Sequence, residues 1–569
     1  MAILEETNTE VLETDVLVLG GGIGGCMAAI RARELGAEVV LIDKANIGRG
    51  GLSHQWSGVI TYFDPETDDY DGCYRECVEG GQWLVDQERL KDMINETTDR
   101  ARDLEKWGVH LQKDATGKYL KSPGVGHYYS RNIYFTQGGF QMMAVVRGEV
   151  LRSGTRVLER VMATDLLTSD GEYPTRGRIT GAVAFHIRNG KFYVIKAKSV
   201  VIATGPATML WRGYAWAPSL SGDGQAMAFR AGCDMRNYDI AFFRFIPAGH
   251  NCASGANILV GEGLHMLNAQ GQRFMEKWDP VRMERATAAT VCRAMTTETQ
   301  ENRCPIWWDA THLDEAAYNR IEKSIPIVVR HLAIEGLNLR TDKIPYTCIL
   351  NDLGPGGIRT STRWGITNLP GLYCGGAVSD HGEDGVSNVI GHGAESAIGG
   401  YRAGEGAAIH SKEIAAPAIN ERQVRELKEQ IYAPLKRNTG IPYREPKLRC
   451  DEIFDSGLLG PIRNEKKLNQ ALEAVLEIKE DVTRLVAKDY HELTRCIGIG
   501  NALLFPQLVA QCALVRTESR GSHVREDYPD RDDANWLKWV LARRKDDQVE
   551  IWTEPIPFEQ YPLKPTTLK

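Results

Sequence analysis

The sequence lacks the features that mark cluster-binding, membrane-spanning and nucleic-acid-binding proteins. Its 12 cysteines include no C-x-x-C pair, so neither an iron–sulfur cubane nor a zinc ribbon is predicted, and no metal site. No run of about 18 apolar residues predicts a membrane span, and the acidic N-terminus does not resemble a secretory signal. With 68 Lys+Arg against 75 Asp+Glu, the net charge of −7 does not favour nucleic acid or an anionic membrane as partner.

The composition is that of a soluble globular protein. The 569 residues are 43% apolar and 25% charged, which is enough for several domains with a large core. The 57 glycines exceed the usual share of ~7%, so we expect close approach of backbone to backbone or ligand. No internal repeat or low-complexity stretch is present. We expect a cytoplasmic protein with reduced thiols, which could form a homo- or hetero-oligomer.

A glycine-rich turn between a strand and a helix is the first strong motif. The apolar run Thr14–Val18 leads into Gly20-x-Gly22-x-x-Gly25, a helix follows, and a second strand ends at Asp43. In such a unit the glycines allow a tight turn and the approach of a pyrophosphate, which binds at the helix N-terminus. The carboxylate then binds a ribose hydroxyl. The pattern predicts a Rossmann-like dinucleotide-binding domain.

Two further strands that end on glycine favour FAD over NAD. SVVIAT stops at Gly205, and Leu372–Tyr373 precedes Gly375, more than 300 residues after the first motif. Both resemble buried parallel strands that end at a ligand-facing turn. A long ligand held by both ends of a large domain suits FAD, and no second motif of comparable quality serves a nicotinamide nucleotide.

Changes of pattern along the chain predict an α/β protein of several segments. The fold class is an FAD-binding Rossmann-like domain of the glutathione-reductase type, with an inserted α+β capping domain and a C-terminal helical domain. The expected bounds are 1–245 and 346–414 for the FAD-binding domain, 246–345 for the cap, 415–530 for the helical domain and 531–569 for the tail. In the tail, WLKWVLAR is predicted to be a helix and DQVEIWTE a strand.

Phrases spread over the chain resemble the flavoprotein subunit of the succinate dehydrogenase/fumarate reductase superfamily. They are ETDVLVLGGGIGG, SLSGDGQAMAFRAG, LNAQGQRFM, PGGIRT, LPGLYCGGA and RTESRGSHVREDYPDRDDANWLKWVL. The middle of the chain is most similar to the adenylylsulfate reductase alpha subunit, in KWGVHLQKDATGKY, YAWAP and Arg244–Ala248. The resemblance implies a flavin enzyme that pairs with an iron–sulfur, ferredoxin-like subunit.

Departures from that family argue against a dicarboxylate substrate. Ile246-Pro247-Ala248-Gly249 stands where the dicarboxylate enzymes have His-Pro-Thr-Gly, and Val260 replaces an arginine before Gly-Glu-Gly. A later family arginine has no match in Val386–Gly391. Binding two carboxylates needs fixed cationic groups, so succinate, fumarate and aspartate are disfavoured. The histidine that attaches flavin in relatives falls on Gly51, with His54 out of place, so non-covalent FAD is expected.

The adenylylsulfate reductase pattern is also incomplete. Its active-site histidine has no counterpart near Val386–Asn388, and an acidic residue is missing around Gln137–Gly139. Of the active-site residues that the resemblance implies, Arg244 and Trp216 remain. The residues that the motif and the resemblance together assign to the cofactor are Gly20, Gly22, Ile23, Gly24, Gly25, Asp43, Lys44, Arg49, Gly50, Gly51, Leu52, Ser53, Ala203, Thr204, Gly205, Asp223, Gly376, Asn388 and Val389.

Several side chains are candidates for catalysis, each with a structural alternative. Arg244, in a phenylalanine-rich run, could hold a substrate anion, stabilise reduced flavin or form an ion pair. Histidines transfer protons near neutral pH, or they are structural. The candidates of this type are His250 and His265 around the cap segment, and His381 and His392 after the flavin-proximal glycines.

Two charged segments and the tryptophans have both functional and structural interpretations. The acidic loop with Asp380, Glu383 and Asp384 could face a cationic or hydroxylated substrate, or be a solvated turn. The charged segment Arg516–Arg525 is predicted to be a structural ion network. Trp56 and Trp216 could form walls of the flavin pocket.

The sequence therefore predicts an FAD-dependent oxidoreductase. Its leading function is electron exchange between a small-molecule substrate at flavin N5 and an iron–sulfur partner. A stand-alone reductase or dehydrogenase of an activated C=C or C–C bond is the second possibility. A non-catalytic electron-transfer flavoprotein subunit is the third.

Overall fold

A computed structural model describes residues 8–56, 58–209, 217, 219–240, 243–249, 255–350, 356–361, 363–380 and 392–568. Its FAD-binding half is a mixed sheet with the strand order β5-β2-β1-β8-β7-β6. Strand β15 pairs with the carboxyl-terminal end of β8. The parallel strands are β1 (Thr9–Leu19), β2 (Val39–Asp43), β5 (Arg156–Glu159), β8 (Phe192–Ile202) and β15 (Leu372–Cys374); the antiparallel ones are β6 (Val161–Thr168) and β7 (Ile179–His186).

The predicted fold class is confirmed, and the strands are longer than the sequence pattern suggested. β1 begins at Thr9 and β8 at Phe192, because both continue as a paired ladder from Thr9↔Phe192 to Leu19↔Ile202. Strands β1, β8 and β15 end where a segment with glycine follows, and β2 ends on Asp43. Ligands of parallel α/β sheets bind at this carboxyl edge.

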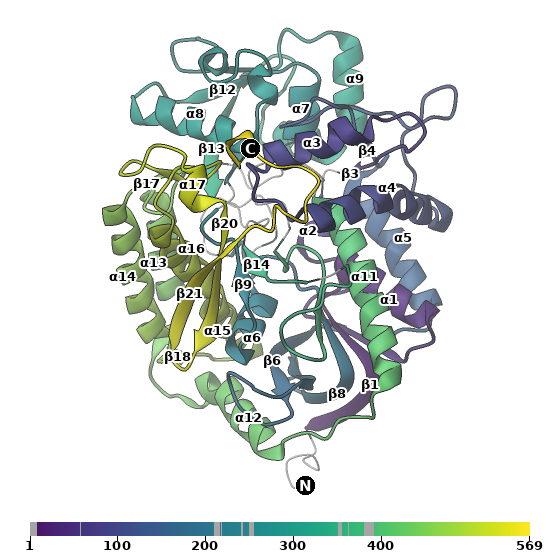
Figure 1. The fold of residues 1–569 in the computed structure, drawn as a ribbon. Coiled ribbons are helices and arrows are strands. Elements are labelled where there is room, and N and C mark those ends of the chain that lie inside the picture. Colours follow the sequence, from purple (N-terminus) through teal and green to yellow (C-terminus); the bar gives the residue numbers. More distant parts are fainter. Residues whose placement is uncertain are drawn as a thin grey trace.

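Helices cover one face of this sheet with unusually close packing (Figure 1). The central pair is α1 (Ile23–Glu34) and α11 (His392–Glu413). A Cβ on Gly400 would lie 2.0 Å from the Gly24 carbonyl oxygen, and one on Gly404 would lie 2.2 Å from that of Ala28. Glycine is therefore required for the two backbones to touch. The other helices of this half are α2 (Gly51–Gln55), α3 (Tyr70–Gly80), α4 (Gln87–Trp107), α5 (Gly138–Arg152) and α6 (Asp223–Ala231).

A two-stranded ribbon, β3 (Val59–Thr61) with β4 (Asn132–Tyr134), lies between this half and the cap. The cap, at the top of Figure 1, is built on the sheet β10-β13-β12-β11. Two of its strands cover residues 243–247 and 344–350, so Arg244 belongs to the cap sheet. The cap elements are α7 (Ala256–Gly261), α8 (Ala288–Gln300), α9 (Glu315–Ser324), α10 (Pro326–Ile334), β10 (Phe243–Pro247), β11 (His265–Leu267), β12 (Ile306–Asp309) and β13 (Ile344–Leu350).

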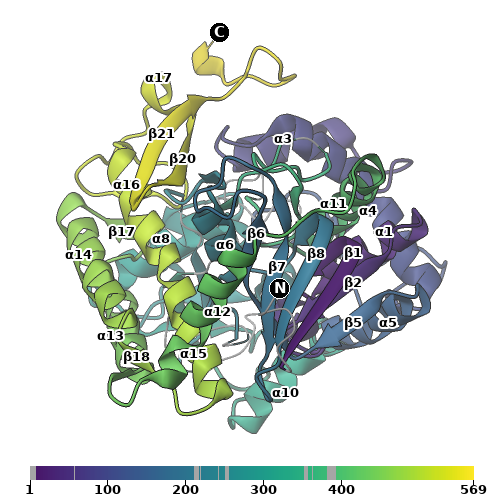
Figure 2. The same cartoon turned by 90° about the horizontal axis from the view of Figure 1, so that it is seen from below.

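The predicted helical region packs beside the FAD-binding half, as the view from below shows (Figure 2). Tyr490–Val515, which covers two of its helices, passes the length and hydropathy test for a membrane span, with a mean hydropathy of 1.5. However, 78% of that apolar window is buried inside the protein, as in a core helix. The elements are α12 (Glu421–Lys436), α13 (Arg444–Asp455), α14 (Glu465–Val482), α15 (Tyr490–Ala502), α16 (Leu504–Val515), and the short strands β16 (Ile441–Pro442), β17 (Ile462–Arg463), β18 (Leu485–Val486) and β19 (Val524–Arg525).

The prediction of a helix at WLKWVLAR was wrong. After the short helix α17 (Asp533–Trp536) this segment forms β20 (Lys538–Lys545), which pairs with β21 (Gln548–Pro555). On its other edge β20 pairs with β9 (Met235–Arg236), which in turn pairs with β14 (Gly357–Ile358). These partners from distant parts of the chain supply the backbone hydrogen bonds of a strand, and tertiary pairing overrides local helical propensity.

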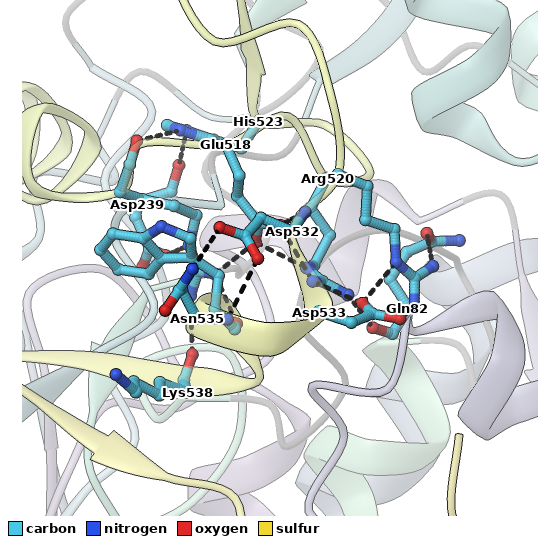
Figure 3. A network of polar contacts seen from close by, with 12 residues as sticks. Gln82, Asp239, Glu518, Arg520, His523, Asp532, Asp533, Asn535 and Lys538 are labelled. Carbon is cyan, nitrogen blue, oxygen red and sulfur yellow. Dashed lines mark hydrogen bonds and ion pairs between the residues drawn. The ribbon is translucent and has the colours of Figure 1, made fainter. Parts of the chain in front are cut away.

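The charged segment near the C-terminus forms a buried ion network (Figure 3). Arg516 pairs with Asp239 at 2.5 Å and with Glu518 at 2.8 Å, and Arg520 pairs with Glu518 at 2.7 Å. All four side chains have zero exposure. Arg520 also donates to the Gln82 carbonyl, so the network ties the C-terminal hairpin to the N-terminal half. It has the structural role that the sequence predicted.

We expect Glu518→Gln to destabilise the protein strongly. Loss of this charge leaves two buried guanidinium groups without their shared carboxylate, which costs about 3–5 kcal/mol. The free energy of unfolding in guanidinium chloride, measured with saturating FAD, would show the loss. Glu550→Gln is the matched control, because its partners Arg543 and Lys545 lie at the surface; it should leave stability unchanged. Equal effects of the two changes would contradict a structural role for the network.

Candidate functional site

The carboxyl edge of the parallel sheet opens into a cavity that reaches the cap. Its sheet-side lining includes Gly20, Gly21, Gly22, Ile23, Gly24, Asp43, Lys44, Gly50, Gly51, Leu52, Ser53, Ala203, Thr204, Gly205, Asp223 and Gly376. Most of the residues assigned to a cofactor are thus brought to one cavity.

The glycine turn after β1 has the close contacts that its motif predicts. Gly20 has φ +107°, and a Cβ there would lie 2.3 Å from the Ala203 carbonyl oxygen. Gly25 does not line the cavity; a Cβ on it would lie 1.8 Å from the Gly20 carbonyl oxygen. Helix α1 begins at Ile23, and Gly22 has no side chain to cap it; of the first amide groups, that of Ile23 donates to the Ser53 hydroxyl.

The end of β2 supplies a carboxylate beside this turn. The Asp43 oxygens each accept a backbone N–H at 2.6 Å, one from Gly21 and one from Ala45, and each oxygen keeps a lone pair for a ligand hydroxyl. Burial raises the pKa of Asp43, while the two amide hydrogen bonds oppose that rise. The neighbouring Lys44 is held by Asp223, with 2.6 Å between Nζ and Oδ2.

The segment before β3 carries five of the residues predicted to bind the cofactor. Gly50, Gly51, Leu52 and Ser53 line the cavity, and the Ser53 hydroxyl accepts the N–H of Ile23 at 3.1 Å. Arg49, predicted to bind the cofactor, does not line the cavity: its guanidinium lies 5.3 Å from the centre of the Phe140 ring. This is a cation–π contact with α5, and a cofactor role of Arg49 stays a prediction.

The cap end of the cavity holds two candidate catalytic side chains, Arg244 on β10 and His392 at the start of α11. Burial lowers the pKa of Arg244 to about 10, so the guanidinium is still charged at neutral pH. Burial, together with the charge of Arg244, lowers the pKa of His392 to about 3. His392 is therefore an uncharged imidazole at neutral pH and can act there as a hydrogen-bond donor or acceptor, not as an imidazolium acid.

The remaining wall at the cap end comes from four elements. Trp56 lines the cavity and packs edge-to-face on Phe135, with 5.7 Å between ring centres. The ribbon β3–β4 contributes one face, the start of α7 contributes another, and Ile325 lies between α9 and α10. The side chains that the sequence did not single out here are Val59, Thr61, Asn132, Tyr134, Ala256, Asn257, Ile258 and Ile325.

Two family descriptions match most of the chain. The family described as "FAD binding domain" matches residues 15–393, and "Fumarate reductase flavoprotein C-term" matches residues 457–568. The chain belongs to the succinate dehydrogenase/fumarate reductase flavoprotein superfamily. FAD is therefore its cofactor, and it is an FAD-dependent oxidoreductase by family.

Relatives of this flavoprotein cover nearly its whole length. One subunit of the fumarate reductase (CoM/CoB) of Methanothermobacter marburgensis is 29% identical over 560 residues, 94% of this chain and 98% of the relative. Among solved structures, FrdA of the E. coli quinol fumarate reductase superposes with a TM-score of 0.89 at 22% identity, covering 97% and 98% of the two chains. Adenylylsulfate reductase of Archaeoglobus fulgidus gives 0.84 at 22%, covering 96% of each. At these identities the two structures show the fold alone.

The observed residues fit FAD. Positive φ and backbone contact at Gly20 leave room only for glycine, the N-cap residue Gly22 of α1 has no capping side chain, and a carboxylate ends β2. These are the features that a diphosphate and a ribose require. The cavity is long enough to continue past them to Arg244 in the cap.

Other candidates of this flavoprotein lie elsewhere or outside the described residues. His265 stacks on His312 at 3.9 Å and does not line the cavity. Asp380 has zero exposure and pairs with Arg236 and Arg89, so its carboxylate does not belong to a solvated or substrate-facing turn. Trp216, His250, His381, Glu383, Asp384, Asn388 and Val389 fall outside the described residues.

Proposed function

We propose that this flavoprotein binds FAD non-covalently and exchanges electrons between a small substrate with a single anionic group and an iron–sulfur, ferredoxin-like partner. When bound, FAD supplies hydride transfer at flavin N5. The observation that carries the proposal is the half-buried Arg244 guanidinium in the cavity wall at the cap end. A charged side chain there is costly unless it serves a ligand or a partner group.

The chain would hold FAD with the residues at the carboxyl edge of the sheet. The first turn of α1 and the Gly20–Gly25 loop would bind the diphosphate, and Asp43 would bind a ribose hydroxyl. The segment Gly50–Ser53 and the glycines after β15 would enclose the ring system. Lys44 is committed to Asp223 and would add positive charge near the cofactor rather than at the substrate.

A single fixed cation at the cap end supports a substrate with one anionic group. Among the described residues that line the cavity, the side chains with permanent positive charge are Lys44 and Arg244. Lys44 lies at the sheet end beside Asp223, whereas Arg244 lies in the cap sheet; we assign to the Arg244 guanidinium a carboxylate or another oxyanion, which its planar fork can bind in bidentate fashion. Among the described residues that line the cap end, a dicarboxylate would place its second charge against uncharged side chains, at a desolvation cost.

The relatives support a partner protein, since the name of the archaeal relative is that of one subunit of a larger enzyme. We propose an iron–sulfur protein of ferredoxin type as the electron donor or acceptor, and the cytoplasm as the location. The flavin would then pass electrons to a cluster held by a separate protein.

Reoxidation of the flavin tests this function. Photoreduced holoenzyme is mixed without oxygen with acrylate, monomethyl fumarate or fumarate, and absorbance at 450 nm is followed. We expect a monoanionic C=C acid to restore the oxidised flavin, and fumarate to be slower. Faster reaction with fumarate would overturn the single-anion assignment. Reoxidation by ferredoxin alone, with no substrate response, would indicate a non-catalytic electron-transfer subunit instead.

A further inference from the structure

We propose that Thr61 and Asn132 form hydrogen bonds to a second, uncharged oxygen group on the substrate. The substrate class is then a monocarboxylate with an additional carbonyl or hydroxyl oxygen. The assignment rests on the proposed function, in which Arg244 takes the anionic group. It makes the β3–β4 ribbon a specificity element for which the sequence contained no motif.

The ribbon presents one face to the cavity. Its register pairs Val59 with Tyr134 and Thr61 with Asn132, and all four of these residues line the cavity. Ile60 and Ile133 alternate with them and belong to the hydrophobic core. Because side chains along a strand point to opposite faces in turn, the Thr61–Asn132 pair faces the cavity side of the ribbon.

This cross-strand pair has polar atoms that the protein leaves unsatisfied. Thr61 and Asn132 are 5% and 3% exposed, and within the described part of the chain neither the Thr61 hydroxyl nor the Asn132 Nδ2 has a hydrogen-bond partner. In contrast, the Tyr134 hydroxyl of the next pair is bonded to the Ser122 hydroxyl at 2.9 Å. Buried polar groups without partners are rare and costly, and a ligand that bonds to them removes the cost.

The described side chains that line the cavity around the pair are uncharged, and some are polar. Asn257 of α7 also lines the cavity, and its Oδ1 accepts the Val125 N–H at 3.2 Å. A Cβ on Gly124 would lie 2.6 Å from the Asn132 Nδ2 and 3.0 Å from the Asn257 Oδ1, so the two amides share the space that this glycine leaves open. Arg131 is next in sequence, but its guanidinium pairs with Glu76 at 2.5 Å, on the other face of the strand. A carbonyl or hydroxyl therefore fits this wall, and a second carboxylate does not.

Binding to the oxidised holoenzyme tests the inference without turnover. The dissociation constants of acrylate and monomethyl fumarate are measured from the flavin difference spectrum; both have one carboxylate, and only the ester has a second carbonyl. We expect monomethyl fumarate to bind about tenfold or more tightly than acrylate, because a site built for a hydrogen bond discriminates against a ligand that lacks it. Thr61→Val and Asn132→Leu should each reduce that preference severalfold and leave acrylate binding unchanged.

Two threonines provide matched controls for Thr61→Val. The Thr180 hydroxyl is also buried and unsatisfied among the described residues, but Thr180 does not line the cavity; the Thr97 hydroxyl donates to the Ile94 carbonyl at 2.9 Å. Thr180→Val should leave binding unchanged, and Thr97→Val should lower the melting temperature only. Thr61→Val should not lower it, since it removes an unsatisfied group.

The outcomes distinguish a failure of this inference from a failure of the proposed function on which it rests. If the preference for the ester is unchanged in both variants, while Arg244→Met still weakens both ligands, the roles of Thr61 and Asn132 are wrong and the proposed function stands. If Arg244→Met affects neither ligand, the anion site itself is wrong. A melting temperature of Thr61→Val as low as that of Thr97→Val would make Thr61 a structural residue and overturn the inference.

Discussion

Gly25→Ala is expected to abolish stable FAD binding. The added Cβ would lie 1.8 Å from the Gly20 carbonyl oxygen and 2.9 Å from its carbonyl carbon, both backbone atoms that cannot rotate away. Either the N-terminus of α1 or the Gly20 turn must move, and these are the groups placed to bind the diphosphate. Overpacking of this kind costs about 3 kcal/mol, so we expect FAD affinity to fall about 100-fold or more.

The measurement is the dissociation constant of FAD for apoprotein, from quenching of flavin fluorescence, with circular dichroism to follow folding. Gly148→Ala is the matched control in α5, where a Cβ would meet only the end of the Arg152 side chain at 3.5 Å. It should bind FAD normally and be slightly more stable, because alanine favours a helix. Wild-type FAD affinity in Gly25→Ala would contradict the role assigned to this contact.

The cofactor half of the site could be predicted from the sequence because its geometry is local. Gly20, Gly22 and Asp43 lie within one β–turn–α–β unit, where strand, turn and helix fix how near the backbone comes to a ligand. Arg49 lies only a few residues beyond Asp43 in sequence. Its direction nevertheless depended on Phe140 of α5, a contact that no local pattern contains.

The substrate half could not be predicted in the same way. Thr61 and Asn132 are 71 positions apart, in strands of only three residues each, and become a pair through the register of the ribbon. The segment Lys538–Lys545 shows the same limit: its apolar residues suit a helix, and its partners β9 and β21 make it a strand. Arg244 could be singled out as a candidate because a charge within a phenylalanine-rich run is informative in itself.

Arg244→Met is expected to remove most of the activity while FAD binding is retained. The guanidinium lies in the cap sheet at the far end of the cavity from the glycine turn, and burial strengthens its attraction for an anion. Methionine keeps much of the side-chain volume and removes the charge. Losing a charge-assisted, bidentate contact costs about 3 kcal/mol or more, so kcat/KM for a monoanionic substrate should fall about 100-fold or more.

Three further measurements show whether the charge acts on the substrate. Arg244→Lys should recover part of kcat/KM, because it restores the charge without the planar fork. Arg293→Met is the matched control: Arg293 lies in α8 of the same cap, exposed and stacked on Trp278, and does not line the cavity. The salt dependence of KM should be weaker in Arg244→Met than in the wild-type enzyme, since the variant no longer attracts the anion. Wild-type kcat/KM in Arg244→Met would place the anion elsewhere in the cavity, whereas loss of FAD along with activity would make Arg244 a residue that stabilises the bound cofactor.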